Sequence, residues 1–371
     1  MDTPTAPPTD DRPEVRLSDP GEIAAALPHL LGFHPRESVV LIGLGGPSGG
    51  RVGLTVRADL PAPHDADAAA AVLTRSLRTD RPAAALVVVV SEDPDLLDPW
   101  ARDDPRALDE EFPDDDLADQ AALPHRSVVH ALVVSLAAAD VPVRDVLLVR
   151  GGRWWSYDCP HACCLPGAGT PLPGGVSALA VAAVTTGQVL ARDRSVLASR
   201  LDPPPGSEKG IRAACLAVVP ERMTRAREVG WAALGEESWA VVLAAVARCR
   251  PGVLAGRLPD DDVAGVAWAL RDTRVRDRAL GLALGEDAAA AEVLWTECTR
   301  RAPTPLDAAP ATLLAVSVWL RGDGAMANVA LERALASDPA HTLARLLRQG
   351  LDACLTPGDL RDLLGRAVDR D

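Results

Sequence analysis

The feature that most constrains the fold is the uneven distribution of strand-like segments along the chain. Before residue 173, short apolar runs typical of strands alternate with segments of helical periodicity. From Val176 onward strand signals nearly vanish, and helical patterns continue to the end of the chain. The first pattern favours a mixed sheet with flanking helices, and the second favours an all-helical domain. We therefore predict a disordered tail over residues 1–16, an α/β domain over 17–173 and an α-helical domain over 174–371.

The composition agrees with two folded domains. The chain has 371 residues, enough for two cores, and hydrophobic residues make up 48% of it against 24% charged residues. In the α/β domain the predicted order is helix–strand–strand–helix–strand–helix–strand–strand, which favours a mixed sheet with helices on its faces. The strands are expected at residues 38–43, 51–60, 83–90, 143–150 and 153–157, and the helices at 19–31, 65–78 and 126–140.

Two polar segments of this domain have competing interpretations. The glycine-rich segment Gly43–Gly50 loosely fits a dinucleotide fingerprint and also the string G-x-S-x-G, but both mechanisms need the loop to open a helix. Because a strand pattern follows at Arg51, we favour a hairpin loop. The acidic segment 93–119 is predicted to be a solvated loop. The alternative is a lid that binds a divalent cation, but the spacing of the acidic residues does not match the calcium-binding loop pattern.

The helical domain is expected to contain a series of short helices. One stretch, from Leu314 to Pro339, has small and apolar residues at the offsets of a single tetratricopeptide-type unit, and an ordinary helical hairpin fits the same pattern. The tryptophans of this domain are interpreted as core anchors: Trp231, Trp239, Trp268, Trp295 and Trp319. The helices are expected at residues 176–200, 211–230, 236–249, 260–270, 274–284, 286–301, 308–321, 324–337, 340–353 and 357–369.

Four polar residues immediately before the first strand are the candidate catalytic residues: His34, Arg36, Glu37 and Ser38. Imidazole, guanidinium, carboxylate and hydroxyl groups together can bind an anion or move a proton. The structural alternative is that His34 and Glu37 cap local backbone groups while Arg36 pairs with a carboxylate. Sites in open α/β sheets favour the carboxyl ends of strands, and this cluster lies at an amino end, which favours the structural alternative.

The densest group of potential metal ligands is Cys159, His161, Cys163 and Cys164. Thiols and an imidazole are ligand types that zinc prefers, although structural zinc sites usually draw ligands from two separated segments. Buried structural thiols are the favoured interpretation, because cysteine often acts as a small core hydrophobe, and a cysteine nucleophile activated by His161 is a third.

Charge and cysteine usage exclude several classes of function. A net charge of −14 without a dense basic run disfavours nucleic-acid binding. The apolar runs are much shorter than the roughly 20 residues that span a bilayer, so no membrane insertion is expected. Seven irregularly spaced cysteines in a chain without a signal-peptide pattern predict reduced thiols and a cytoplasmic protein.

Several blocks of the chain resemble a mainly actinobacterial family known only as a domain of unknown function. The Phe-His-Pro and Arg-Trp-Trp-Ser-Tyr blocks are the most specific, and the resemblance covers most of the chain. It implies a bacterial, cytoplasmic setting and carries no activity or catalytic residue. The blocks are Leu17–Pro20, Leu31–Pro35, Ser38–Leu41, Arg153–Tyr157, Cys159, Cys163-Cys164, Gly169–Leu172 and Trp319–Ala325.

The sequence therefore predicts a binding or regulatory protein. The helical domain is expected to contact a protein partner, and the α/β domain to bind a small ligand. The alternative is a hydrolase whose site combines the Cys159–Cys164 segment, with or without zinc, and the His34–Ser38 cluster. That alternative requires the two clusters to meet in one concave pocket.

Overall fold

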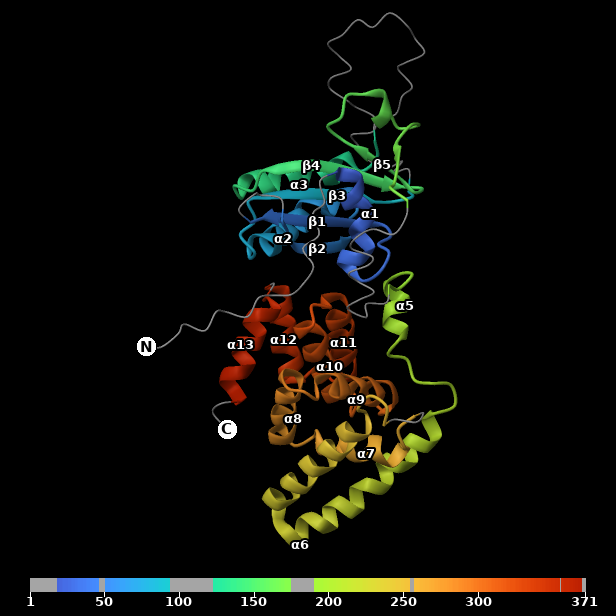
Figure 1. The fold of residues 1–371 in the computed structure, drawn as a ribbon, viewed down its shortest axis with the longest axis vertical. Helices are drawn as coiled ribbons and strands as arrows, with labels where there is room; N and C mark the ends of the chain where they lie inside the picture. The colour runs from blue at the N-terminus through green and yellow to red at the C-terminus, as the bar shows by residue number, and fades with distance from the viewer. Residues whose placement is uncertain are drawn as a thin grey trace, which may run out of the picture. The chain divides into compact units, whose positions relative to one another are not determined.

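The computed structural model describes residues 19–46, 51–93, 123–174, 190–253, 257–353 and 355–368. The chain divides into two compact units, Met1–Leu190 and Ala191–Asp371, which are coloured blue to green and yellow-green to red in Figure 1. The predicted tail, most of the predicted acidic loop and residues 47–50 of the glycine-rich segment lie outside the described residues.

The first unit is built on a six-stranded mixed sheet, which confirms the predicted fold class (Figure 1). Its strand order is β2-β1-β3-β4-β5-β6, with β3 and β4 parallel and every other pair antiparallel. The two-residue β6 is too short to leave a pattern in the sequence. The strands are β1 (Ser38–Gly45), β2 (Arg51–Asp59), β3 (Ala84–Val90), β4 (Val143–Arg150), β5 (Arg153–Ser156) and β6 (Thr170–Pro171).

Helices cover both faces of this sheet. Alternate residues of the central strands, such as Val39 and Val87, share a core with α2 (Ala66–Arg78) and α3 (Arg126–Ala138). On the opposite face α1 (Pro20–Leu31) comes so close to β5 that a Cβ added at Gly21 would lie 2.6 Å from Trp154 Nε1. Burial on two faces explains why β1 is a continuous apolar run and not an alternating one.

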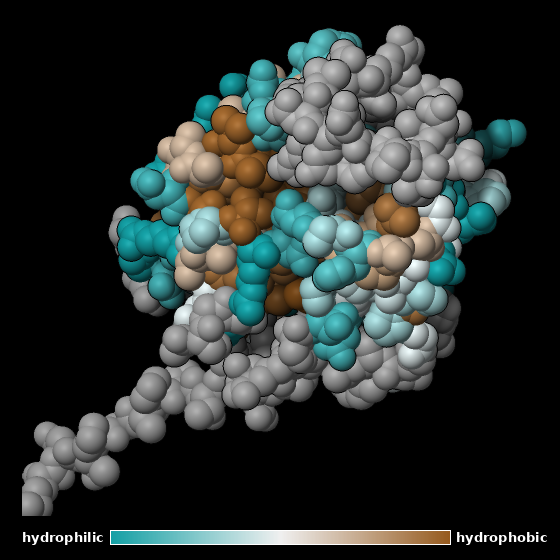
Figure 2. All heavy atoms as spheres, turned by 90° about the horizontal axis from the view of Figure 1, so that it is seen from above, coloured by the Kyte–Doolittle hydropathy of each residue, from teal (hydrophilic) through white to brown (hydrophobic). Residues whose placement is uncertain are grey.

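Part of the hydrophobic surface is open to solvent. Viewed from above, the molecule shows hydrophobic residues gathered between polar ones (Figure 2). In the described part of the first unit, the large hydrophobic side chains classed as exposed are Val72 on α2, Val134 on α3 and Leu165. They are single residues on separate elements and define no common groove.

The second unit is entirely helical in the residues described, as predicted. Residues 176–189 of the predicted helix 176–200 lie outside the described residues, and its described part contains the six-residue helix α5 (Arg194–Ser199). The helices are α5 (Arg194–Ser199), α6 (Glu208–Arg248), α7 (Asp260–Ala269), α8 (Thr273–Leu280), α9 (Ala288–Arg301), α10 (Ala308–Leu320), α11 (Gly324–Ser337), α12 (Thr342–Asp352) and α13 (Pro357–Val368).

Helix α6 consists of two arms joined at Gly230, where the backbone has φ 79° and ψ 160° (Figure 1). Almost only glycine adopts this conformation, so the presence of a glycine at position 230 explains why the helix breaks there. Among the described helices, α6 alone has the length and apolar composition of a membrane-crossing helix. This is weak evidence for a membrane span, because α6 is broken at Gly230 and contains Pro220 in its first arm.

Helices α10 and α11 form the hairpin expected from the sequence. Asp307, which precedes α10, is fully buried and accepts hydrogen bonds from Arg333 and Ser337 near the end of α11. The start of one helix therefore lies beside the end of the next, so the two run antiparallel. The apolar residues matched to the tetratricopeptide offsets are buried in this hairpin, while a tetratricopeptide identity stays a prediction.

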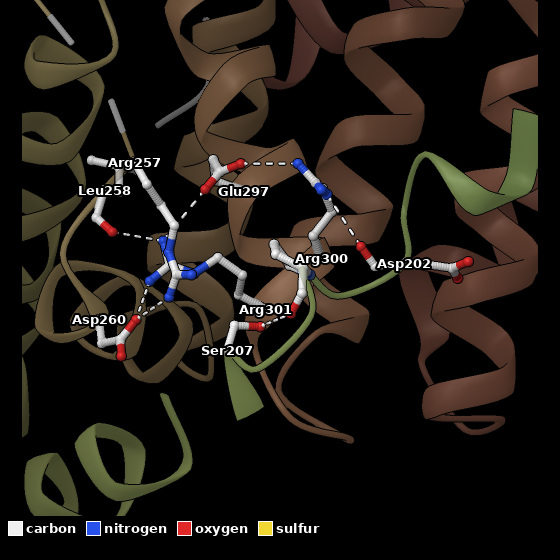
Figure 3. A network of polar contacts seen from close by, with 9 residues as sticks. Asp202, Ser207, Arg257, Leu258, Asp260, Glu297, Arg300 and Arg301 are labelled. Atoms are coloured by element: carbon white, nitrogen blue, oxygen red, sulfur yellow. Dashed lines mark hydrogen bonds and ion pairs between the residues drawn. The ribbon is translucent and has the colours of Figure 1, made fainter. Parts of the chain in front are cut away.

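A buried arginine joins α7 to α9 in the same unit. The Arg301 side chain has no exposed area; it donates to the carbonyl of Leu258 at 2.7 Å and forms ion pairs with Asp260 and Glu297 (Figure 3). Asp260 also accepts from Arg257, which is 42% exposed. Burial alone would raise the pKa of Asp260, but the hydrogen bonds from Arg257 and Arg301 outweigh it and hold that pKa below its usual range.

We predict that Arg301→Ala lowers the free energy of unfolding by about 3 kcal/mol, because it opens a cavity and removes the donors that serve Leu258 and Glu297. Arg257→Ala is the matched control, since it removes an exposed partner of the same Asp260 and should cost below about 1 kcal/mol. Urea unfolding of both variants measures the difference. Equal losses would mean that burial of Arg301 contributes nothing.

Candidate functional site

The four candidate residues before β1 differ in how far they are buried. His34 and Arg36 are exposed, and Arg36 forms no ion pair within the described residues. Ser38 is fully buried; its hydroxyl donates to the carbonyl of Arg36 at 2.6 Å and accepts from Nη2 of Arg57 at 2.6 Å. The hydroxyl proton of Ser38 is thus committed to the backbone.

Glu37 contacts residues that the sequence analysis did not select. Its Oε2 accepts from the hydroxyl of Ser91 at 2.6 Å, and its Oε1 accepts from the backbone N–H of Glu92 at 2.8 Å. The Ser91 hydroxyl lies 3.0 Å from Nε2 of His125. Ser91 and His125 are buried, with 1% and 5% of their surfaces exposed. A carboxylate, a hydroxyl and an imidazole therefore meet at one point.

Strand direction explains why these residues meet. β1 runs antiparallel to β3, with Ser38 opposite Val90, and β3 runs parallel to β4. The amino end of β1 therefore lies at the same edge of the sheet as the carboxyl ends of β3 and β4. The argument against this cluster from its position at an amino end was wrong, because this edge is where α/β sheets place ligand sites.

The hydrogen-bond directions assign roles to the three groups. Ser91 Oγ also accepts from the backbone N–H of Asp93 at 3.0 Å, and an ionised Glu37 can only accept. Ser91 therefore donates its proton to Glu37, and Nε2 of His125 carries a proton that it donates to Ser91. In an activated serine the imidazole accepts that proton, so this network holds three elements together and does not generate a nucleophile.

Two members of this network have left-handed backbones. Glu37 has φ 37° and His125 has φ 62°, a region that residues other than glycine rarely occupy. Each residue is held there by its neighbours: Glu37 by its carboxylate contacts, and His125 as the residue that precedes α3. Such strain persists only where surrounding contacts fix the conformation, which makes this edge a rigid part of the unit.

Three of the four predicted metal ligands lie together. The sulfur atoms of Cys159, Cys163 and Cys164 all lie within 4.8 Å of one another, at 3.8 Å for Cys159–Cys163 and 3.9 Å for Cys163–Cys164. His161 is exposed and its side chain lies outside this cluster. We call the three residues the thiol cluster.

The thiols differ in acidity. A hydrogen bond from the backbone of His161 lowers the pKa of Cys159, whereas burial raises the pKa of Cys164 to about 11. Burial also raises the pKa values of Cys215, Cys249 and Cys298 in the helical unit, which are structural thiols of its core.

The thiol cluster and the His34–Ser38 segment, which the hydrolase alternative needs in one pocket, are connected only through other residues. Within the described residues, no hydrogen bond or ion pair joins the thiol cluster to the His34–Ser38 segment. The nearest connection is through Tyr157, whose hydroxyl donates to the carbonyl of Pro124 at 2.6 Å, next to His125. Among the described residues, the hydrolase alternative therefore has no direct contact between its two clusters to support it.

The helical unit contains a cleft of about 410 Å³ at the bend of α6. Met223 from the first arm, and Trp231 and Leu234 from the second, supply apolar walls, and Trp268 comes from the end of α7. Trp268 and Leu234 pack with Ala226 of the first arm, so the angle at Gly230 sets the geometry of the cleft. The rest of the lining is Gly235, Ser238, Arg271, Asp272, Thr273 and Arg274.

Two of the residues that line the cleft have polar groups without a partner in the described part of the chain. The indole N–H of Trp268 is buried and has no hydrogen-bond partner among the described residues. Arg271 is exposed and forms no ion pair in the described part of the chain, and Arg274 lies 3.8 Å from Asp272 while its side chain is 77% exposed. Buried donors without partners are rare and require an explanation, and a ligand supplies one.

The interpretation of the tryptophans as core anchors is wrong for Trp231. Trp295, Trp319 and Trp268 are buried, but Trp231 is 58% exposed beside the glycine that breaks α6. The sequence signal was present as Gly230-Trp231 within a helical pattern. Helical periodicity alone did not distinguish a break with an exposed aromatic from the interior of a helix.

Comparison with known proteins gives one match. A family model described as a domain of unknown function (DUF4192) matches residues 20–358. The chain belongs to this family. The predicted resemblance to a domain of unknown function is thereby confirmed, while its actinobacterial distribution stays a prediction. Neither the curated proteins nor the solved structures contain a match to this DUF4192 chain.

We predict that Ser91→Ala lowers the free energy of unfolding of this DUF4192 protein by about 1–3 kcal/mol, because it removes the hydroxyl that serves both Glu37 and His125. Ser76→Ala is the control, since the Ser76 side chain forms no hydrogen bond in the described chain. Its effect should stay within about 0.5 kcal/mol. Equal urea midpoints for the two variants would show that the network does not stabilise the sheet edge.

A second prediction concerns the bend of α6. Gly230→Ala is expected to cost about 1–3 kcal/mol, because a Cβ meets no atom within 4 Å but the backbone conformation excludes it. Gly285→Ala, equally open but at an ordinary φ of −102°, should be neutral or slightly stabilising. Denaturant unfolding monitored by tryptophan fluorescence compares the two. A neutral Gly230→Ala would mean that the break at Gly230 is not needed.

Proposed function

We propose that this protein is a binding protein whose helical unit takes up a segment of a partner protein in the cleft at the bend of α6. The segment combines an apolar side chain with a neighbouring Asp or Glu. The observation that carries the proposal is a cleft lined by the exposed Trp231, by Arg271, which has no ion pair among the described residues, and by Trp268, whose buried indole N–H has no hydrogen-bond partner among them.

The apolar part of the ligand is inferred from the walls. Trp231 exposes a large aromatic surface beside Met223, whose flexible thioether adapts to ligands of different shape. Aromatic residues in such positions dominate the binding energy of many interfaces, and arginine is enriched with them. A leucine or phenylalanine side chain fits a cleft of this size and lining.

The carboxylate is inferred from the donors. Arg271 and Arg274 line the cleft and carry positive charge, and the buried N–H of Trp268 has no acceptor among the described residues. A carboxylate accepts from both donor types, and hydrogen bonds with a charged partner are about twice as strong as neutral ones. The chain as a whole carries a net charge of −14, so these arginines are a local exception and selectivity depends on contact inside the cleft.

This proposal places recognition in the helical unit and a supporting role in the α/β unit. The exposed His34 and Arg36 lie at the sheet edge where α/β folds place ligand sites, which supports small-ligand binding there. Ligand binding in one unit and partner binding in the other would make the protein a regulator in a cytoplasmic setting. The hydrolase alternative is the weaker proposal because its two clusters share no contact.

The test uses fluorescence polarisation with the full chain and labelled hexapeptides that differ at one position. Peptides with a Leu-Asp pair are expected to bind about tenfold more tightly than those with Leu-Asn or Leu-Lys, because only the carboxylate meets the arginines. Trp268→Phe keeps an aromatic side chain, although a smaller one, and removes the N–H, and Arg271→Gln removes the charge. Each change should weaken Leu-Asp binding about tenfold.

Two exposed residues elsewhere in the helical unit give matched controls. Arg366→Gln removes an exposed arginine of α13, and Leu346→Ala removes an apolar side chain of α12 that is 59% exposed. Neither should alter peptide affinity, whereas Trp231→Ala should abolish most of it. Tighter binding of the Leu-Lys peptides, or equal losses in controls and cleft variants, would contradict the proposal, as would no binding by any peptide.

A further inference from the structure

We propose that the thiol cluster of Cys159, Cys163 and Cys164 binds one zinc ion, with His161 as the fourth ligand. The inference concerns the α/β unit and is independent of the cleft in the helical unit. It rests on the distances between three sulfur atoms, on the backbone around them and on the position of one imidazole.

The sulfur separations match those of a zinc–thiolate site. With zinc–sulfur bonds of about 2.3 Å, two thiolates at corners of a tetrahedron lie roughly 3.8 Å apart. The observed separations are 3.8 Å for Cys159–Cys163 and 3.9 Å for Cys163–Cys164, and all three sulfurs lie within 4.8 Å of one another. Three sulfurs that meet at this spacing can therefore bind a single ion with little movement.

The backbone around the cluster is prearranged to stabilise sulfur ligands. The N–H of Ser156 donates to Cys164 Sγ at 3.4 Å, and the backbone of His161 donates to Cys159. Donors of this kind, one step removed from the metal, orient ligands and hold negative charge on sulfur. The loop is also fixed to β5: Trp155 Nε1 donates to the carbonyl of Leu165 at 3.0 Å, and Arg153 donates to the carbonyl of Ala168 at 2.8 Å.

The position of Cys163 argues against the alternative of inert packing. Its side chain is exposed, whereas Cys215, Cys249 and Cys298 are all buried in the helical unit. A cysteine that only fills core space is typically buried. A disulfide between Cys159 and Cys163 would need their sulfurs to close from 3.8 Å to about 2.05 Å, so the observed arrangement is reduced.

His161 is assigned as the fourth ligand from its place in the loop. It lies between Cys159 and Cys163 and immediately precedes the 3-10 turn Ala162–Cys164. Its imidazole is exposed and makes no hydrogen bond or ion pair among the described residues, so rotation about its side-chain bonds breaks no contact. Three cysteines and one histidine are an established composition of structural zinc sites.

Zinc at this position would act as a clamp on the end of the sheet. Residues 157–169 connect β5 to the two-residue β6, and a strand pair this short contributes little stability by itself. An ion bound by four residues of this connection fixes the loop against Trp155. The expected consequence is a zinc-dependent stability of the α/β unit.

The first experiment measures zinc by elemental analysis in the full chain purified under reducing conditions. About one zinc ion per chain is expected, falling to nearly none in Cys159→Ser/Cys163→Ser and remaining in the control Cys215→Ala. A chain that is metal-free as purified and takes up no zinc from solution overturns the proposal. Zinc retained in the double variant overturns the assignment of its ligands.

A second measurement uses the wild-type chain, so its result does not depend on whether a variant folds. The wild-type chain is stripped of metal with a chelator and titrated with Co²⁺, which reports its ligands through its absorption spectrum. Sulfur-to-cobalt charge-transfer bands with tetrahedral d–d bands support the site, and their absence overturns it. In His161→Ala the charge-transfer bands should persist while the d–d bands shift, and unchanged d–d bands would overturn the role of His161.

Discussion

The antiparallel pairing of β1 with β3 is the constraint on which the α/β unit depends. It brings the start of β1 to the carboxyl ends of the only parallel pair, β3 and β4. Glu37 then contacts Ser91, the residue after β3, and Ser91 contacts His125, the residue before α3. One strand direction thus gathers a carboxylate, a hydroxyl and an imidazole from three distant segments. A parallel β1 would leave Glu37 at the opposite edge.

The helical unit depends on a different kind of constraint, a glycine that cannot be replaced without strain. Gly230 turns one long helical segment into two arms, and the angle between them leaves Trp231 exposed and Trp268 with an unused donor. In the same unit, Arg301 ties α9 to the start of α7 with a fully buried guanidinium. A cleft that is already formed before binding costs less entropy when a ligand enters.

The fold could be predicted largely from the sequence, because helical and strand periodicities are local. Within the described residues, the order of helices and strands as far as β5 and the hairpin between β1 and β2 were predicted correctly. Strand pairing is not local, and this is why the contacts of Ser91 with Glu37 and His125 were not predicted. The thiol cluster could be found because its cysteines are neighbours in sequence.

The difference between local patterns and contacts that are distant in sequence also explains why the cleft was not predicted. The cleft is formed by Met223, Trp231 and Trp268, which belong to three helical segments and carry no shared motif. Their side chains are the types that also fill cores, so composition cannot separate a binding surface from an interior. A binding surface differs from an interior in that some of its polar groups have no hydrogen-bond partner within the protein. A donor that folding leaves unsatisfied is visible only after every other hydrogen bond has been placed, and among the described residues Trp268 has such a donor and lines the same cleft as Arg271.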